Sequence, residues 1–134
     1  MLGDFKWHRR YMDIAKLVAS WSKDPRKQVG CVLTDELNRI VATGYNGPPR
    51  GLDILKPKDR LALTIHAELN AILTSDREFI TCYTWPVLPC HACMAALAQS
   101  GVQRVVSLQE PSAKWRWYIS QQICDTLGIE VITL

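Results

Sequence analysis

Two short segments of this chain carry the residue types of a metal site, and they constrain the fold because they must meet in space. The first is His66-Ala67-Glu68, and the second is Pro89-Cys90-His91-Ala92-Cys93. One imidazole and two thiolates are ligands that zinc prefers, and they leave its fourth tetrahedral position open for water. A structural zinc site usually closes with a fourth cysteine or histidine. The pattern therefore predicts a catalytic zinc site with His66, Cys90 and Cys93 as ligands.

Both segments stand where helices are expected to begin. After the first segment, Leu69, Ile72 and Leu73 recur at the spacing of one helix face. The second segment has proline at its start, an alanine-rich middle and glycine at its end, which is the usual punctuation of a helix. We predict helices from about residue 66 and over residues 89–101. Two helix N-termini would then face one metal, and their partial positive charge favours thiolate ligands.

Glu68 is not needed as a ligand in this arrangement. A carboxylate beside the open position can move protons between water and a substrate, so we predict that Glu68 is the catalytic acid and base. Histidine, glutamate, proline and C-x-x-C in this order match the known signature of zinc-dependent nucleobase deaminases. The alternatives are a structural zinc site and a redox C-x-x-C. A redox pair would not require His66 and Glu68 before it.

Composition indicates an ordinary globular protein. The chain has 134 residues, of which 48% are hydrophobic and 22% charged, which predicts one domain over residues 1–134. No apolar run is long enough to span a membrane, and the N-terminus is not a signal peptide. Cys31, Cys82 and Cys124 lie in apolar patterns typical of buried thiols, so we expect a cytoplasmic protein. The net charge of +3 suits a small phosphorylated substrate and gives little support for nucleic-acid binding.

Strands and helices alternate along the chain, which predicts an α/β domain whose sheet lies between helical layers. Ligands of such sheets gather at the carboxyl ends of strands, where helices begin. Besides the two metal helices, we expect helices at residues 4–21 and 112–127, strands at residues 29–34, 39–43, 80–85, 103–108 and 129–134, and a loop at residues 44–60.

Four segments of the chain carry a family resemblance. They are Ser22-Lys23-Asp24-Pro25, Gln28-Val29-Gly30-Cys31-Val32-Leu33, Thr43-Gly44-Tyr45-Asn46-Gly47 and His66-Ala67-Glu68-Leu69-Asn70-Ala71-Ile72. Together they resemble the deoxycytidylate (dCMP) deaminase family, and the resemblance runs from about Tyr11 to the C-terminus. Cytidine deaminases usually carry a cysteine where His66 stands, and transfer-RNA adenosine deaminases share the histidine but differ around both motifs.

The resemblance implies a three-layer α/β/α cytidine-deaminase-like fold with a mixed, roughly five-stranded central sheet. It implies conversion of dCMP to dUMP and ammonia, which supplies dUMP for thymidylate synthesis. It also implies a homohexamer that dCTP activates and dTTP inhibits, each bound with Mg²⁺. Some relatives bind a second zinc through an insertion after Gly47, which this chain lacks, so we expect one Zn²⁺ per subunit.

The resemblance also assigns roles to individual residues. It implies that Asn46 holds the deoxyribose, because an amide can donate to and accept from a sugar hydroxyl. A turn residue at Asn46, a solvated charged turn at residues 23–26 and a plain surface arginine at Arg77 remain open as alternatives. The implied set is Asn46, Ala67, Arg26 and Ser22 for substrate, Lys23, Asp24, Gly44, Tyr45 and Gly47 for the effector, and Arg77 at the subunit interface.

Two segments leave the substrate partly open. Residues 85–88 depart from the family pattern beside the metal helix, so the number of substrate phosphates is not fixed. The basic stretch Lys56-Pro57-Lys58-Asp59-Arg60 fits either a guide for phosphates or a solvated loop. The alternatives are therefore a deaminase of dCTP or of another small aminated base or nucleotide. A polynucleotide-editing deaminase needs an electropositive groove and aromatic platforms, whose signs are missing here.

Overall fold

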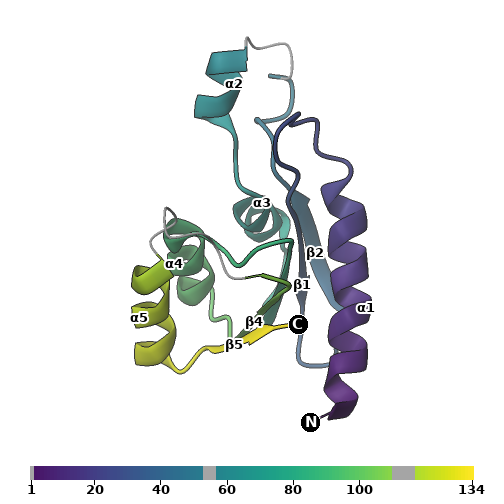
Figure 1. Ribbon diagram of the computed structural model, residues 1–134, viewed down its shortest axis with the longest axis vertical. Helices are drawn as coiled ribbons and strands as arrows, with labels where there is room; N and C mark the ends of the chain where they lie inside the picture. Colours follow the sequence, from purple (N-terminus) through teal and green to yellow (C-terminus); the bar gives the residue numbers. More distant parts are fainter. Residues whose placement is uncertain (1, 53–56, 110–116) are drawn as a thin grey trace.

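The computed structural model describes residues 2–52, 57–109 and 117–134, and it places helices on both faces of one sheet (Figure 1). Helix α1 (Leu2–Ala19) covers one face. Helices α3 (Ala67–Thr74), α4 (His91–Gln99) and α5 (Trp117–Leu127) cover the other. The predicted three-layer arrangement is therefore confirmed.

The sheet has five strands in the order β2-β1-β3-β4-β5. Strand β1 is antiparallel to both of its neighbours, whereas β3, β4 and β5 are parallel. This mixture is the predicted one, and it places the ends of β2 and β3 beside the helices that carry the metal ligands. The strands are β1 (Gly30–Thr34), β2 (Ile40–Tyr45), β3 (Thr81–Trp85), β4 (Arg104–Ser107) and β5 (Glu130–Thr133).

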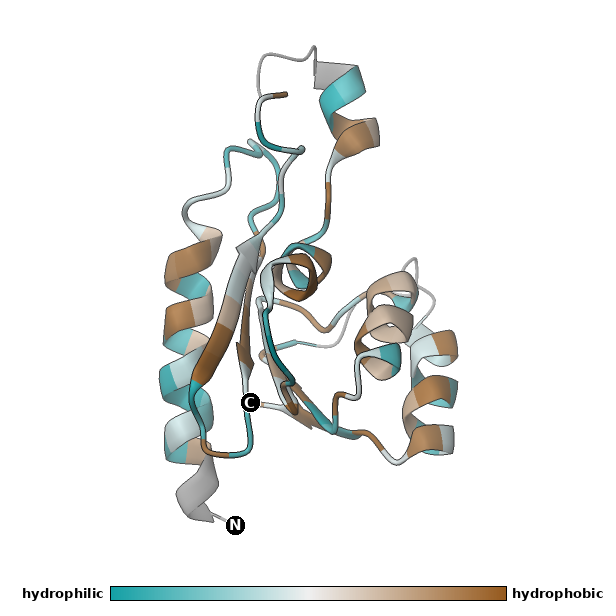
Figure 2. Ribbon diagram, turned by 180° about the vertical axis from the view of Figure 1, so that it is seen from behind, coloured by the Kyte–Doolittle hydropathy of each residue, from teal (hydrophilic) through white to brown (hydrophobic). Residues whose placement is uncertain are grey.

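Side chains along the inner strands alternate between the two faces of the sheet, so the core has two layers. In β1, Cys31 and Leu33 belong to the apolar cluster under α3, α4 and α5, whereas Val32 belongs to the cluster under α1. This is the period of two that a pleated strand requires. Helix α1 shows alternating hydrophobic and hydrophilic bands in Figure 2, as an amphipathic helix does. In the same layer, His8 Nδ1 and the hydroxyl of Tyr83 form a buried hydrogen bond of 2.8 Å.

The prediction of a loop over residues 44–60 is wrong at both ends. Strand β2 continues to Tyr45, and helix α2 (Pro57–Leu63) occupies the end of the segment. Proline suits the first helical position because its missing N–H is not needed there. Lys56 of the basic stretch lies outside the described residues, as does the predicted start of the last helix at residue 112. No helix in the described ranges is long and apolar enough to cross a membrane.

Candidate active site

The structure brings the three predicted metal ligands together. His66 is the N-cap residue of α3, and Cys90 is the N-cap residue of α4. His66 Nδ1 lies 3.4 Å from Cys90 Sγ and 3.4 Å from Cys93 Sγ. A tetrahedral zinc with Zn–N of about 2.0 Å and Zn–S of about 2.3 Å requires N···S separations of roughly 3.5 Å. The three side chains therefore fit a zinc ion.

Backbone hydrogen bonds fix the two segments that precede these helices. Ile65 and Gly47 exchange hydrogen bonds, with Gly47 N to Ile65 O at 3.1 Å and Ile65 N to Gly47 O at 2.8 Å. They tie the approach to His66 to the end of β2. The backbone N–H of Leu88 donates to Gln109 O at 3.0 Å, which ties the approach to α4 to the segment after β4. The positions of the metal ligands therefore depend on hydrogen bonds between segments that are distant in the sequence.

The two ligand thiols differ in acidity. Contact with Cys93 and then with His66 lowers the pKa of Cys90 to about 3 against the cost of its burial. The same contact with Cys90, together with burial, raises the pKa of Cys93 well above its ordinary value. The hydrogen bond to Cys90 raises the pKa of His66. Thiols bind a metal as thiolates, so metal binding has to displace the protons that these ligands hold.

Glu68 lies in the first turn of α3 and is only 4% exposed. Burial raises the pKa of its carboxyl from 4.5 to about 7. A group with a pKa near the working pH can both take up and release a proton, as general acid–base catalysis requires. The predicted catalytic residue therefore lies beside the metal ligands in a suitable state.

A cavity of about 690 Å³ opens onto Glu68, His66 and Cys90. Asp24, Arg26, Asn46 and Ala67, which the sequence singled out, line it too. The sequence did not single out Lys27, Leu61 or Thr64. It left open whether Arg60 guides phosphates or belongs to a solvated loop. The only sequence signal for Lys27 was its position beside Arg26. The lining residues are Asp24, Pro25, Arg26, Lys27, Val29, Asn46, Arg60, Leu61, Thr64, His66, Ala67, Glu68, Val87, Leu88 and Cys90.

Asn46 holds the loop before β1 in place. Its Oδ1 accepts from Val29 N at 2.9 Å, and its Nδ2 donates to Lys27 O at 2.8 Å. Ser22 supports the same contact, because its hydroxyl donates to Asn46 O at 2.8 Å. Each amide atom retains capacity for one more hydrogen bond, since the NH₂ has two hydrogens and the oxygen two lone pairs. Asn46 therefore has a structural role and can still contact a ligand in the cavity.

Asp24 arranges the basic residues that follow it. Its Oδ1 accepts from Arg26 N at 2.8 Å and from Lys27 N at 3.1 Å, which is a turn closed by a carboxylate. The back of this loop borders a second cavity of about 600 Å³, which Lys23 and Trp85 also line. Trp85 packs with the core under α1 and does not line the cavity of Glu68.

The other predicted effector residues line neither of these two cavities. Gly44 is buried under α3, where a β-carbon would lie 2.4 Å from Ala67 O. The ring of Tyr45 lies edge-on to that of Trp21, with centroids 6.3 Å apart. A β-carbon on Gly47 would meet nothing within 4 Å. An effector role for these three residues stays a prediction.

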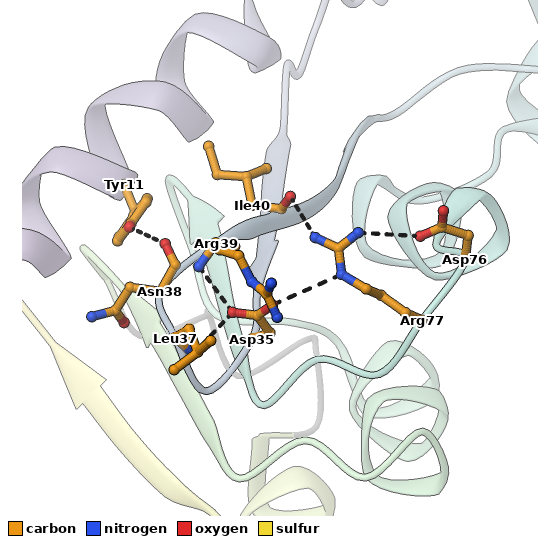
Figure 3. Close-up of polar contacts among 8 residues, drawn as sticks. All are labelled: Tyr11, Asp35, Leu37, Asn38, Arg39, Ile40, Asp76 and Arg77. Carbon is orange, nitrogen blue, oxygen red and sulfur yellow. Dashed lines mark hydrogen bonds and ion pairs between the residues drawn. The ribbon is translucent and has the colours of Figure 1, made fainter.

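Arg77 contacts a buried carboxylate of its own chain (Figure 3). Its Nε lies 3.8 Å from Asp35 Oδ2, and its Nη2 donates to Ile40 O at 3.4 Å. Asp35 also pairs with Arg39 Nε at 2.7 Å and accepts the N–H groups of Leu37 and Arg39. Burial alone would raise the pKa of Asp35, but these hydrogen bonds lower it. Arg77 is 45% exposed, and its interface role stays a prediction.

Residues 5–109 match the family described as the cytidine and deoxycytidylate deaminase zinc-binding region. The chain belongs to this family. The predicted resemblance to dCMP deaminases is confirmed, because a probable deoxycytidylate deaminase of Caenorhabditis elegans is 41% identical over 80% of this chain. The chain spans 59% of that relative. As a member of the family, this protein is an enzyme of hydrolytic deamination with a zinc-binding deaminase domain.

Two further relatives extend over nearly the whole chain. A deaminase from the luxG 3′ region of Aliivibrio fischeri, itself uncharacterized, is 37% identical and covers 96% of this chain and 94% of its own length. The crystal structure of dCMP deaminase from the cyanophage S-TIM5 in complex with dCMP and dUMP has a TM-score of 0.79. It is 27% identical and covers 94% of this chain and 95% of the phage chain.

Proposed function

We propose that this enzyme hydrolyses dCMP to dUMP and ammonia, and that it depends on one zinc ion held by His66, Cys90 and Cys93. The observation that carries the proposal is a buried carboxyl, Glu68, with a pKa of about 7 in the same cavity as a His/Cys/Cys ligand set. The nucleotides dCMP and dUMP, which the phage dCMP deaminase binds in its crystal structure, support this substrate and product.

Zinc, when bound at these three residues, supplies the activation that makes water nucleophilic near neutral pH. Glu68 accepts the proton that the water loses and delivers it to a ring nitrogen of the cytosine. Glu68 then takes the second proton of that water from the hydroxyl now on the ring carbon and transfers it to the amino group. The bond between that carbon and the amino nitrogen breaks, ammonia leaves, and the water oxygen remains on the ring as the carbonyl of uracil. Each transfer needs a carboxyl that exchanges protons near pH 7, as burial of Glu68 provides.

The remaining substrate residues orient the nucleotide. The spare hydrogen-bonding capacity of Asn46 suits the deoxyribose hydroxyl, and the Arg26 guanidinium suits the 5′-phosphate. Ala67 lines the wall between His66 and Glu68. Ser22 contributes through its hydrogen bond to Asn46 O, which holds Asn46 in position.

Regulation and assembly belong to the same proposal, with the family resemblance as their support. We propose that dCTP activates and dTTP inhibits the enzyme, each with Mg²⁺ on its triphosphate. Lys23 and Asp24, with Gly44, Tyr45 and Gly47, are the effector residues. The assembly is a homohexamer with Arg77 near the interface. The enzyme works in the cytoplasm, where its product supplies thymidylate synthesis.

A deaminase of dCTP or of another small aminated nucleotide is the second candidate. Its support is the positive charge of the cavity, because Arg26, Lys27 and Arg60 all line it. A triphosphate offers more anionic oxygens to such side chains than a phosphate monoester does.

Ammonia release by zinc-loaded enzyme tests these proposals. We would offer dCMP, dCTP and deoxycytidine separately, each with and without dTTP and Mg²⁺. We expect dCMP to be the best substrate and dTTP to suppress its turnover. Preference for dCTP would favour the second candidate. Turnover of dCMP that dTTP leaves unchanged would retain the activity and remove the regulation. No turnover of any of the three would contradict both dCMP and dCTP as substrates and leave only another small aminated nucleotide.

A further inference from the structure

The side chain of Asn70 joins the catalytic helix α3 to the end of strand β2. Its Nδ2 donates to the backbone oxygen of Tyr45, the last residue of β2, at 2.7 Å. The same nitrogen lies 3.5 Å from the backbone oxygen of Ile65, the residue before His66. One amide NH₂ carries two hydrogens and can serve two acceptors. Asn70 does not line the active-site cavity, so these contacts place it behind the cavity wall.

The pairing of β2 explains why the carbonyl of Tyr45 is available to α3. Strand β2 is an edge strand of the sheet, with β1 as its antiparallel neighbour. The backbone N–H of Asn46 donates to Val29 O at 3.3 Å, so Asn46 directs its backbone groups toward that neighbour. Successive residues of an antiparallel strand alternate in this respect, and Tyr45 therefore directs its own groups away from β1. Asn70 supplies a donor for the oxygen on that open side.

This contact lies between the two parts of the proposed substrate site. Asn46, which follows Tyr45, is the residue proposed to hold the deoxyribose, whereas Glu68 on α3 acts on the base. The side-chain hydrogen bonds of Asn46 run to the loop before β1. Asn70 instead ties the residue next to Asn46 to the helix that carries Glu68. A nucleotide has to meet both parts at once, so their relative position matters for binding and for turnover.

Hydrogen bonds to the α3 segment flank Asn46 on both sides along the chain. After it, Gly47 exchanges two backbone hydrogen bonds with Ile65. Before it, Tyr45 accepts from the side chain of Asn70. Backbone groups are present whatever the residue type, but the second bond requires an amide at position 70. A substitution of Asn70 can therefore release one side of Asn46 and leave the other side held.

We propose that Asn70 is a positioning residue that fixes Asn46 relative to the catalytic helix, so that the 3′-hydroxyl of the substrate is bound while its base lies against Glu68. The inference rests on the proposed function, since it takes Asn46 as the residue that binds the sugar of dCMP. Asn70 acts through Tyr45 and Asn46 and does not itself contact the nucleotide.

The test compares dCMP with 2′,3′-dideoxycytidine monophosphate, which lacks the 3′-hydroxyl. In zinc-loaded enzyme, Asn70→Ala should lower kcat/KM for dCMP by roughly 3- to 10-fold, mainly through KM, because the sugar loses about one hydrogen bond. For the dideoxy substrate the change should stay below about twofold, since the contact through which Asn70 acts is missing there. An equal loss for both substrates would mean that Asn70 only supports the fold, and it would overturn the inference. Unchanged kcat/KM for dCMP would overturn it as well.

Thr74→Val is the matched control. Thr74 lies one turn further along α3, where its hydroxyl reaches the backbone oxygen of Thr43 on β2 at 3.5 Å, and it does not line the active-site cavity. The change should leave both substrates within about twofold of wild type. Asn70→Gln keeps the two donor hydrogens on a longer side chain and should recover part of the loss for dCMP. If Asn70→Ala does not fold, Asn70→Asp decides the question, because it keeps the size and removes both donors; an equal loss for the two substrates in it would count against the inference.

A binding measurement separates this inference from the proposed activity. Calorimetric titration of zinc-loaded protein with dUMP and with 2′,3′-dideoxyuridine monophosphate needs no turnover. Wild type should bind dUMP more tightly, and Asn70→Ala should remove most of that difference. If this result appears without deamination of dCMP, the proposed function fails and the role of Asn70 stands. If wild type deaminates dCMP but binds the two ligands equally, or if Asn70→Ala keeps the full preference, the role of Asn70 fails and the proposed function stands.

Discussion

A β-carbon on Gly44 would lie 2.4 Å from the backbone oxygen of Ala67, the residue between His66 and Glu68. It would also lie 2.5 Å from the backbone nitrogen of Ala71, so α3 rests directly on strand β2. The atoms in contact are backbone atoms, which cannot move aside as the end of a flexible side chain can. The position of the catalytic helix therefore depends on the missing side chain of Gly44.

We expect Gly44→Ala to destabilise the protein by at least about 1–3 kcal/mol, because overpacking has to displace α3 or β2. Displacement of α3 moves His66 and Glu68 together, so zinc affinity and turnover should both fall. Urea unfolding and zinc content would measure these effects. Gly47→Ala is the control for stability, since a β-carbon there meets nothing within 4 Å. A Gly44→Ala variant as stable as wild type would contradict the packing argument.

Glu68 and Cys93 should separate proton transfer from metal binding. Glu68→Ala should retain zinc and lose about 10²- to 10⁴-fold in kcat, because it removes the proton carrier and none of the ligands. Cys93→Ala should lose zinc and turnover together, since it removes one of three ligands. Metal analysis and ammonia release on the same preparations measure both quantities. Near-normal activity of Glu68→Ala would disprove the assigned role.

Stability of the zinc-free protein should fall as pH rises through the titration of Glu68. Its pKa rises from 4.5 to about 7 on folding because its charged form is desolvated. Below about pH 4.5 both states hold the proton, and between pH 4.5 and 7 only the folded state holds it. Release of this proton by the unfolded chain therefore lowers the free energy of unfolding. The decrease reaches about 3 kcal/mol and is complete above pH 7.

Glu68→Gln isolates this effect because glutamine does not titrate. The free energy of unfolding of Glu68→Gln relative to wild type should increase between about pH 4.5 and 7 and stay constant above. Denaturant unfolding in the presence of a chelator, at pH 5 and at pH 8, provides the measurement. A difference between the two proteins that does not change with pH would show that the carboxyl ionises normally in the folded state.

Arg77→Gln should have little effect on the fold of the subunit. Arg77 is 45% exposed, and Asp35 keeps its closer partner Arg39 at 2.7 Å, so we expect a cost below about 1 kcal/mol. If Arg77 lies at the subunit interface as proposed, the same change should weaken association measurably. Analytical ultracentrifugation over a range of concentrations, beside thermal unfolding, compares the two effects. A large loss of subunit stability with unchanged assembly would contradict the proposed interface role.

Several features of the site were predictable because they are local in the sequence. The proximity of His66, Glu68, Cys90 and Cys93 could be predicted because ligand types, a helix-starting proline and helical periodicity occur within a few residues of one another in each segment. The three-layer architecture followed from the alternation of strands and helices. Residues 44–60 were less predictable, since glycine and proline in this segment indicated a loop and concealed the short helix α2.

The sequence by itself determined the proposed chemistry of this protein, because a candidate ligand set and a candidate proton carrier follow from residue identity and order. Only the tertiary structure decided that Gly44 supports α3, that Asn46 holds the loop before β1, and that Arg60 reaches the active-site cavity from α2. Each of these roles depends on contact between segments that are distant in the chain. Such contacts arise from how the layers pack, which the pattern of neighbouring residues does not encode.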